Sequence, residues 1–246
     1  DLENELALIE NWLGAQRAYD NVPAISAAVL LEDELAWSGG FGLADIETGR
    51  PAQADTIYGI CSISKLFTGM AVMQLRDAGK FQLDDPLEKL LSWFELEQSF
   101  DGSPPITMRA VLTHSAGLPR ESDYPYWMPP DFDFPTSDAI RKRLSDQSTL
   151  YPADRFYQYS NLGLSLAGEV VAEQSGENYD EYVRKNILAP LDLSDRETGY
   201  PTDGREPRVA TGYSYPGRDH QLKPMPRYDT AVITPAAGFA STAPDL

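Results

Sequence analysis

The chain has 246 residues, of which 42% are hydrophobic and 11% aromatic, so it can bury the core of one large domain or two small ones. It holds 20 Lys and Arg against 38 Asp and Glu, and the net charge of −18 excludes nucleic acid and anionic membrane surfaces as partners. No run of about 18 apolar residues occurs, so we expect no membrane-spanning helix.

A helix followed by a β-hairpin is predicted at the start of the chain. Apolar residues recur at helical spacing over residues 2–13, and Gly14 and Pro23 bracket the exit from this helix. Residues 24–45 are predicted to form two strands around a turn at Glu32-Asp33, closed by the pair Gly39-Gly40.

The next predicted element is a helix over residues 62–78, ended by Gly79. Its residues are apolar on nearly every face, so we expect it to be buried all round. Ser62 and Lys65 begin this helix, which sets the hydroxyl and the amine one turn apart on one face. Cys61, the only cysteine, precedes Ser62 and is expected to be a buried, inert thiol.

Two further helices are predicted over residues 162–174 and 179–188, and they end at Gly176 and before Pro190. The long connection 123–135 alternates aromatic residues with prolines and acids. Two interpretations of this connection stay open, the wall of a binding cleft and a packed surface loop.

Ser62 and Lys65 form the pattern S-x-x-K, in which a lysine of lowered pKa removes the proton of a serine that attacks a carbonyl. Tyr159 and Asn161 stand just before the helix at 162–174, where a phenol could relay the proton and an amide could hold an acyl side chain. Each spacing alone is a weak signal. Tyr19-Asp20-Asn21 matches the second pattern equally well, but it ends the first helix.

Several segments in order resemble the penicillin-recognising serine hydrolases, in the branch of class C β-lactamases, D-alanyl-D-alanine peptidases and β-lactamase-like esterases. Residues 59–91 are similar to the nucleophile helix of that family, 106–119 to its His-x-x-Gly-Leu loop, and 156–193 to its tyrosine motif with two helices. The segments "ATGYSY" and "TPAAGFASTAPDL" are similar to two further landmarks. This order is far more specific than any single motif.

The resemblance implies a β-lactamase/transpeptidase-like fold, which is an α/β structure with an antiparallel sheet flanked by helices, together with a helical region. We expect one serine-hydrolase domain over residues 1–246. The α/β layer would comprise about 1–58 and 225–246, and the helical region about 59–224.

The resemblance also implies roles for single residues. Ser62 would be the acylated nucleophile, Lys65 its proton acceptor, Tyr159 the general base or relay, and Asn161 a substrate contact. The backbone N–H of Ser62, at a helix N-terminus, would form half of an oxyanion hole. His114 is expected to fix its loop rather than to act as a base.

Substrates implied by the resemblance are small-molecule esters, β-lactams or peptides, and it favours an extracytoplasmic location. No cofactor is expected, and two distant histidines with one cysteine offer no ligand set for a metal. The alternative function is a non-catalytic binding or scaffolding member of the same fold. The presence of serine, lysine, tyrosine and asparagine together argues against this alternative, since a surface role needs none of them.

One departure from the family is evident. The third active-site element, Lys-Thr-Gly or His-x-Gly, does not occur in the chain, since Thr211-Gly212 lacks the lysine and His114 belongs to another landmark. We therefore expect that the natural chain extends past Leu246 or that a second polypeptide completes the fold, with strands that pair with the predicted hairpin.

Overall fold

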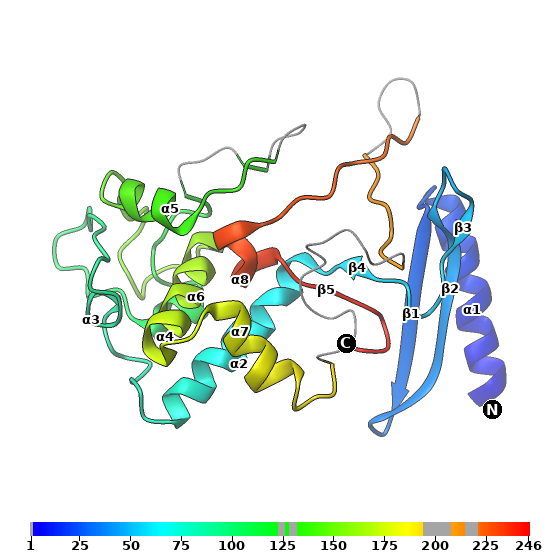
Figure 1. Cartoon of the computed structure of the whole chain (residues 1–246), viewed down its shortest axis with the longest axis horizontal. Coiled ribbons are helices and arrows are strands. Elements are labelled where there is room, and N and C mark those ends of the chain that lie inside the picture. Colours follow the sequence, from blue (N-terminus) through cyan, green and yellow to red (C-terminus); the bar gives the residue numbers. More distant parts are fainter. Residues whose placement is uncertain (1, 123–125, 128–131, 194–207, 215–220) are drawn as a thin grey trace. The chain divides into compact units, whose positions relative to one another are not determined.

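The computed structural model of the chain describes residues 2–122, 126–127, 132–193, 208–214 and 221–246. These residues separate into two units (Figure 1). The first unit comprises the described residues within 1–59, 197–227 and 240–246, and the second those within 60–196 and 228–239. The single serine-hydrolase domain expected over residues 1–246, with its division into an α/β layer and a helical region, stays a prediction.

The first unit is built on an antiparallel hairpin. Helix α1 (Leu2–Tyr19) precedes β1 (Ala24–Leu31) and β2 (Glu34–Asp45), and the whole of β1 pairs with residues 34–42 of β2. The turn falls at Glu32 and Asp33, as the sequence predicts, and both residues have positive φ. The short β3 (Arg50–Pro51) pairs with β2 on the edge opposite β1.

Helix α1 ends at Tyr19, between Gly14 and Pro23, as the sequence predicts. The predicted closure of the hairpin at Gly39-Gly40 is wrong, because β2 continues past this pair to Asp45. A Cβ at Gly40 would lie 2.6 Å from the backbone of Ala52, so this glycine permits a close approach of two segments. Glycine therefore serves packing here and not termination.

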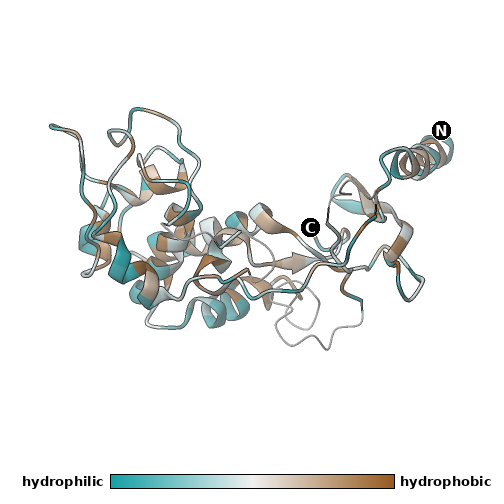
Figure 2. Cartoon of the chain, turned by 90° about the horizontal axis from the view of Figure 1, so that it is seen from above, coloured by the Kyte–Doolittle hydropathy of each residue, from teal (hydrophilic) through white to brown (hydrophobic). Residues whose placement is uncertain are grey.

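Helix α1 carries both hydrophilic and hydrophobic residues, as Figure 2 shows at the N-terminus. It contains no buried residue, and Leu8 and Trp12 are 70% and 59% exposed. Strand β4 (Tyr58–Gly59) pairs antiparallel with β5 (Ala240–Ser241) and completes the strands that the structure describes in this unit.

The second unit is helical, and α6 (Asn161–Ser175) is its centre, with buried residues from Asn161 to Gly168 without a break. The most extensive helix contacts of α6 are with α2 (Ser64–Asp77), α4 (Met108–Leu112), α7 (Tyr179–Val183) and α8 (Thr234–Ala237). The remaining helical segments are α3 (Leu87–Leu90), α5 (Ser137–Leu144), the π-helical turn Arg184–Leu188 and the 3₁₀ turns Cys61–Ile63 and Ala231–Ile233.

Glycines do end the helices of the second unit where the sequence predicts. Helix α6 ends at Ser175, and Gly176 follows with φ +73°. Helix α2 ends at Asp77, and Gly79 also has φ +73°. Both residues adopt the left-handed conformation that glycine reaches without a steric penalty.

The expectation that α2 is buried all round is wrong. Phe67, Ala71 and Val72 are buried, whereas Leu66 is 69% exposed and Met70 is 43% exposed. Helices α6 and α8 cover one face of α2, and the apolar residues on its other face stay exposed among the described residues. Apolar residues on nearly every face of α2 therefore did not predict how many of its faces are covered.

Part of the connection at 123–135 lies outside the described residues, namely 123–125 and 128–131. Among the described part, Tyr126 and Phe134 are buried, and their ring centroids lie 5.3 Å apart. Tyr228 stacks on Phe134 at 5.2 Å. These described aromatic side chains therefore pack on one another.

Candidate active site

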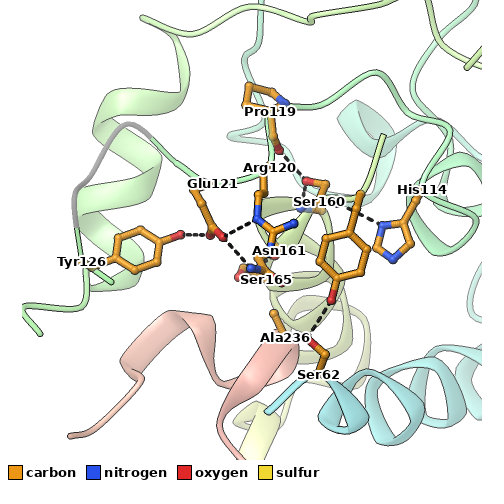
Figure 3. A network of polar contacts seen from close by, with 12 residues as sticks. Ser62, His114, Pro119, Arg120, Glu121, Tyr126, Ser160, Asn161, Ser165 and Ala236 are labelled. Atoms are coloured by element: carbon orange, nitrogen blue, oxygen red, sulfur yellow. Dashed lines mark hydrogen bonds and ion pairs between the residues drawn. The ribbon is translucent and has the colours of Figure 1, made fainter. Parts of the chain in front are cut away.

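The candidate active site lies entirely within the second unit, where several segments of the chain meet (Figure 3). Ser62 belongs to the 3₁₀ turn Cys61–Ile63 that leads into α2, and Lys65 is the second residue of α2. Tyr159 and Asn161 stand at the start of α6. Local structure thus fixes the spacing within each pair, and helix packing brings the two pairs together.

The hydroxyl of Ser62 is the point at which the predicted residues converge. Lys65 Nζ donates to Ser62 Oγ at 3.2 Å, and the phenol of Tyr159 donates to the same oxygen at 2.7 Å. The first contact joins residues one helical turn apart. The second joins residues that are 97 positions apart in the sequence.

Lys65 has two further hydrogen-bond acceptors. Its Nζ donates to Oδ1 of Asn161 at 2.8 Å and to the carbonyl oxygen of Ala236 at 2.8 Å. Burial lowers the pKa of Lys65 below its ordinary value, although the neighbouring Tyr159 and Glu121 oppose this effect. At a given pH, the side chain of Lys65 is therefore neutral in a larger fraction of molecules than a lysine side chain in water.

The carbonyl of Ala236 reaches Lys65 because α8 packs tightly against α6 and α2. A Cβ at Gly168 of α6 would lie 2.2 Å from the ring of Pro235, so this glycine permits the close approach of α8. Thr68 Oγ1 donates to the carbonyl of Pro235 at 2.6 Å. The backbone N–H of Phe239 donates to Ser64 Oγ at 3.0 Å and anchors the far end of the same segment.

Asn161 is 4% exposed, and both ends of its amide have partners. Oδ1 accepts from Lys65, and Nδ2 donates to Glu121 Oε1 at 2.6 Å. Ser160 caps α6, since its Oγ accepts from the N–H of Gly163 at 2.8 Å. The substrate contact expected of Asn161 stays a prediction, because its amide faces protein groups here.

His114 holds together the loop that leads into the site. Its Nδ1 accepts from the N–H of Ser160 at 3.2 Å, and its ring centroid lies 4.5 Å from that of Tyr159. Burial and the charge of Lys65 lower the pKa of His114, so Nδ1 is available as an acceptor. These contacts agree with the loop-fixing role expected from the sequence. In the same loop, Gly117 has φ +72°, and a Cβ there would lie 2.0 Å from the carbonyl oxygen of Tyr151.

Three groups of the site were missed by the sequence interpretation. Glu121 carried no signal, since it is one of 38 acidic residues, and Ala236 contributes a backbone atom, which any residue could supply. Arg120 places its guanidinium 5.0 Å from the ring centroid of Tyr159.

The expectation that Cys61 is a buried thiol is wrong, because this residue is exposed. Its φ is +46°, and it begins the 3₁₀ turn Cys61–Ile63.

Within the part of the chain that the structure describes, no cluster of three or more His, Cys, Asp or Glu residues could hold a metal ion. Nor does any helix in that part have the length and the apolar character needed to cross a bilayer.

Comparison with known proteins gives consistent matches. The family model described as Beta-lactamase matches residues 9–246. Beta-lactamase-like protein 2 of Dictyostelium discoideum is 29% identical over 92% of this chain and 41% of its own length. The D-alanyl-D-alanine-carboxypeptidase/endopeptidase AmpH of Escherichia coli is 32% identical over 59% of this chain and 37% of its own length.

A solved structure extends this similarity to the fold. The octameric penicillin-binding protein homologue from Pyrococcus abyssi superposes with a TM-score of 0.82 at 28% identity, over 98% of this chain and 54% of that one. The predicted fold class, β-lactamase/transpeptidase-like, is thereby confirmed. The chain spans about half the length of that protein and less than half the length of the two relatives.

Proposed function

Because the chain belongs to the beta-lactamase family, whose members are serine hydrolases, we propose that it cleaves ester or amide carbonyls through an acyl-enzyme on Ser62. In the first step Lys65 takes the hydroxyl proton while Oγ attacks the carbonyl carbon, and the alcohol or amine leaves. In the second step water, activated by Tyr159 or Lys65, releases the acid and restores Ser62.

The hydrogen-bond geometry of Lys65 is the observation that carries this proposal. A neutral amine has two hydrogens and one lone pair. The carbonyl oxygens of Asn161 and Ala236, each at 2.8 Å, can only accept, so they take both hydrogens. A charged Lys65 has a third hydrogen, which it donates to Ser62 Oγ at 3.2 Å. When this proton leaves, the lone pair of the neutral amine faces the same oxygen, which is the direction a proton acceptor requires.

Tyr159 is suited to move the proton onward. Its phenol donates to Ser62 Oγ at 2.7 Å, and Lys65 Nζ lies 4.8 Å from the centroid of its ring. A phenol in this position can pass a proton to the leaving group and later accept one from water. Lys65 is therefore the base that takes the proton of Ser62 during attack, and Tyr159 is the group that transfers a proton to the leaving group.

The start of α2 offers stabilisation for the oxyanion. Ser62 lies in the turn that leads into α2, where the first N–H groups of a helix lack intrahelical acceptors and the helix dipole favours negative charge. A carbonyl attacked by Ser62 would develop its negative charge beside these groups. The proposal assigns the N–H of Ser62 as one donor.

A cavity beside Lys65 has room for an apolar group of a substrate, although Ser62 and Tyr159 are not among its lining residues. It has a volume of about 390 Å³ and is lined by Lys65, Gly69, His114 and the apolar side chains Leu66, Met73, Leu112 and Leu164. An acyl or alkoxy chain would bury apolar surface there. We therefore propose carboxylic esters as the first substrate class, with β-lactams and D-alanyl peptides as the other candidates.

A fluorophosphonate probe tests the proposal, because it phosphonylates an activated serine without knowledge of the substrate. We expect one added phosphonyl mass on Ser62 in the full-length protein and none in Ser62→Ala. Ser92→Ala, which changes an exposed serine of the same unit, serves as the control and should be labelled like the wild type. Equal labelling of Ser62→Ala would refute the assignment, and so would no labelling of the wild type, as a non-catalytic binding member predicts.

A further inference from the structure

Glu121 is a carboxylate within the site that the proposed mechanism does not use. It follows Arg120 on the segment between the His114 loop and Tyr126 (Figure 3). Its Oε1 accepts from Asn161 Nδ2 at 2.6 Å, and its Oε2 accepts from the phenol of Tyr126. Since Asn161 is 4% exposed and Tyr126 is 1% exposed, this carboxylate is held by side chains that cannot move freely.

We propose that Glu121 is a positioning residue that sets the orientation of Lys65 through the amide of Asn161. The inference rests on the proposed function, since it concerns the base of that reaction. Glu121 touches neither Ser62 nor Lys65 by any hydrogen bond of the network, and the chain of contacts runs from Glu121 to Asn161 to Lys65.

The orientation follows from the chemistry of the three groups. An amide can present either its oxygen or its nitrogen to a neighbour, but an ionised carboxylate only accepts hydrogen bonds. Glu121 therefore obliges Asn161 to turn Nδ2 toward it and Oδ1 toward Lys65. With the carbonyl of Ala236 as a second acceptor, two hydrogens of Lys65 are directed away from Ser62. A carboxylate behind the amide thus decides which way the lone pair of the base points.

The charge of Glu121 has a second, opposite effect. The charged and titratable groups that face Lys65 are Tyr159, Glu121, Arg120 and His114. Of these, Tyr159 and Glu121 raise the pKa of Lys65 and Arg120 lowers it, against the dominant lowering by burial. Arg120 Nε lies 3.6 Å from Glu121 Oε1 and offsets part of its charge. Glu121 therefore orients the amine well but reduces the fraction that is neutral.

The effects of Glu121 on the orientation and on the pKa of Lys65 predict two separate changes in the pH profile of labelling, which a purely structural residue would not give. In Glu121→Gln the charge is lost and the amide of Asn161 can reverse. The limiting rate of fluorophosphonate labelling at high pH should fall roughly tenfold, because the base is less well oriented. The midpoint of the rise in rate with pH should move to lower pH, because the pKa of Lys65 falls when the charge of Glu121 is lost.

Glu169→Gln is the matched control. Glu169 is a partly buried glutamate of the same unit, with a 2.6 Å ion pair to Arg141, and it has no contact with the network. Tyr126→Phe is the second variant, which keeps the charge of Glu121 and removes one of its hydrogen bonds. We expect it to lower the limiting rate while the midpoint stays unchanged. Tyr126→Phe also serves as the test if circular dichroism shows that Glu121→Gln does not fold.

The outcomes separate the two proposals. If Ser62 of the wild type is labelled and Glu121→Gln keeps both the wild-type midpoint and the wild-type limiting rate, the inference about Glu121 is wrong and the proposed function stands. A lower limiting rate with an unmoved midpoint in Glu121→Gln also overturns it, because loss of the charge must lower the pKa of the base. If Glu121→Gln does not fold, a wild-type limiting rate in Tyr126→Phe overturns the inference about Glu121. If the wild type takes no label on Ser62, the proposed function itself fails.

Discussion

The side-chain nitrogen of Lys65 donates a 2.8 Å hydrogen bond to the backbone carbonyl of Ala236, which lies 171 positions later in the chain. Because this acceptor is a backbone atom, no side chain can be removed to test it. Its place depends on how closely α8 packs on α6, and the narrowest point of that contact is Gly168 against Pro235.

Gly168→Ala is expected to weaken the site from a distance. The added methyl would meet Pro235 at 2.2 Å, so α8 must shift and withdraw the carbonyl of Ala236 from Lys65. We expect the rate of Ser62 labelling to fall roughly tenfold and the free energy of unfolding to fall by about 1–3 kcal/mol. Gly163→Ala on the same helix is the control, since its methyl would be 3.4 Å from its nearest neighbours. Equal labelling rates in the two variants would contradict the prediction.

Lys65→Ala is expected to slow labelling of Ser62 by a factor of about 10² to 10⁴, the usual loss on removal of a positioned base. The stopped-flow or mass-spectrometric rate of phosphonylation measures this effect. Lys89→Ala removes a lysine whose ion pair with Asp85 is on the surface, and this variant should keep the wild-type rate. A Lys65→Ala rate within threefold or so of the wild type would show that another group accepts the proton.

Tyr159→Phe separates attack from turnover. Its ring and its packing against His114 remain, and only the hydroxyl that donates to Ser62 is lost. We expect turnover of a p-nitrophenyl ester to fall about 10²-fold, with a smaller fall in phosphonylation, because the phenol acts mainly on the leaving group and on water. Tyr157→Phe, which changes a neighbouring tyrosine that is 71% exposed, should have normal kinetics. Undiminished turnover in Tyr159→Phe would remove this residue from the mechanism.

His114 predicts a pH dependence of stability. Burial and Lys65 lower its pKa in the folded protein, whereas the unfolded chain has the ordinary value of about 6.5. The unfolded state therefore binds more protons as the pH falls below about 6.5, and the free energy of unfolding falls with it. Protonation at Nδ1 would also break the hydrogen bond from Ser160.

Thermal unfolding between pH 7.5 and pH 5 measures this contribution. We expect the Tm of the wild type to fall more steeply than that of His114→Gln, which cannot gain the proton. Parallel curves for the wild type and His114→Gln would mean that His114 does not contribute.

The sequence by itself determined the local part of the site. Lys65 follows Ser62 by three positions, and this spacing of one helical turn allows their side chains to meet at 3.2 Å. The turn at Glu32-Asp33 and the ends of α2 and α6 at glycines were predictable for the same reason, since turn and cap conformations depend on the residues within them. The pattern at Tyr159 was visible in the sequence, but only the family resemblance favoured it over Tyr19, and its contact with Ser62 spans 97 positions.

Only the tertiary structure decided the rest. Gly40 looks like a stop in the sequence, but the backbone of Ala52 makes it a site of close packing. Leu66 and Met70 look like core residues, but helices cover only one face of α2 in the described part of the chain. Ala236 and Glu121 act on Lys65 through a backbone oxygen and through another side chain. Periodicity encodes geometry within one element, whereas the neighbours of a lysine are set by how several elements pack.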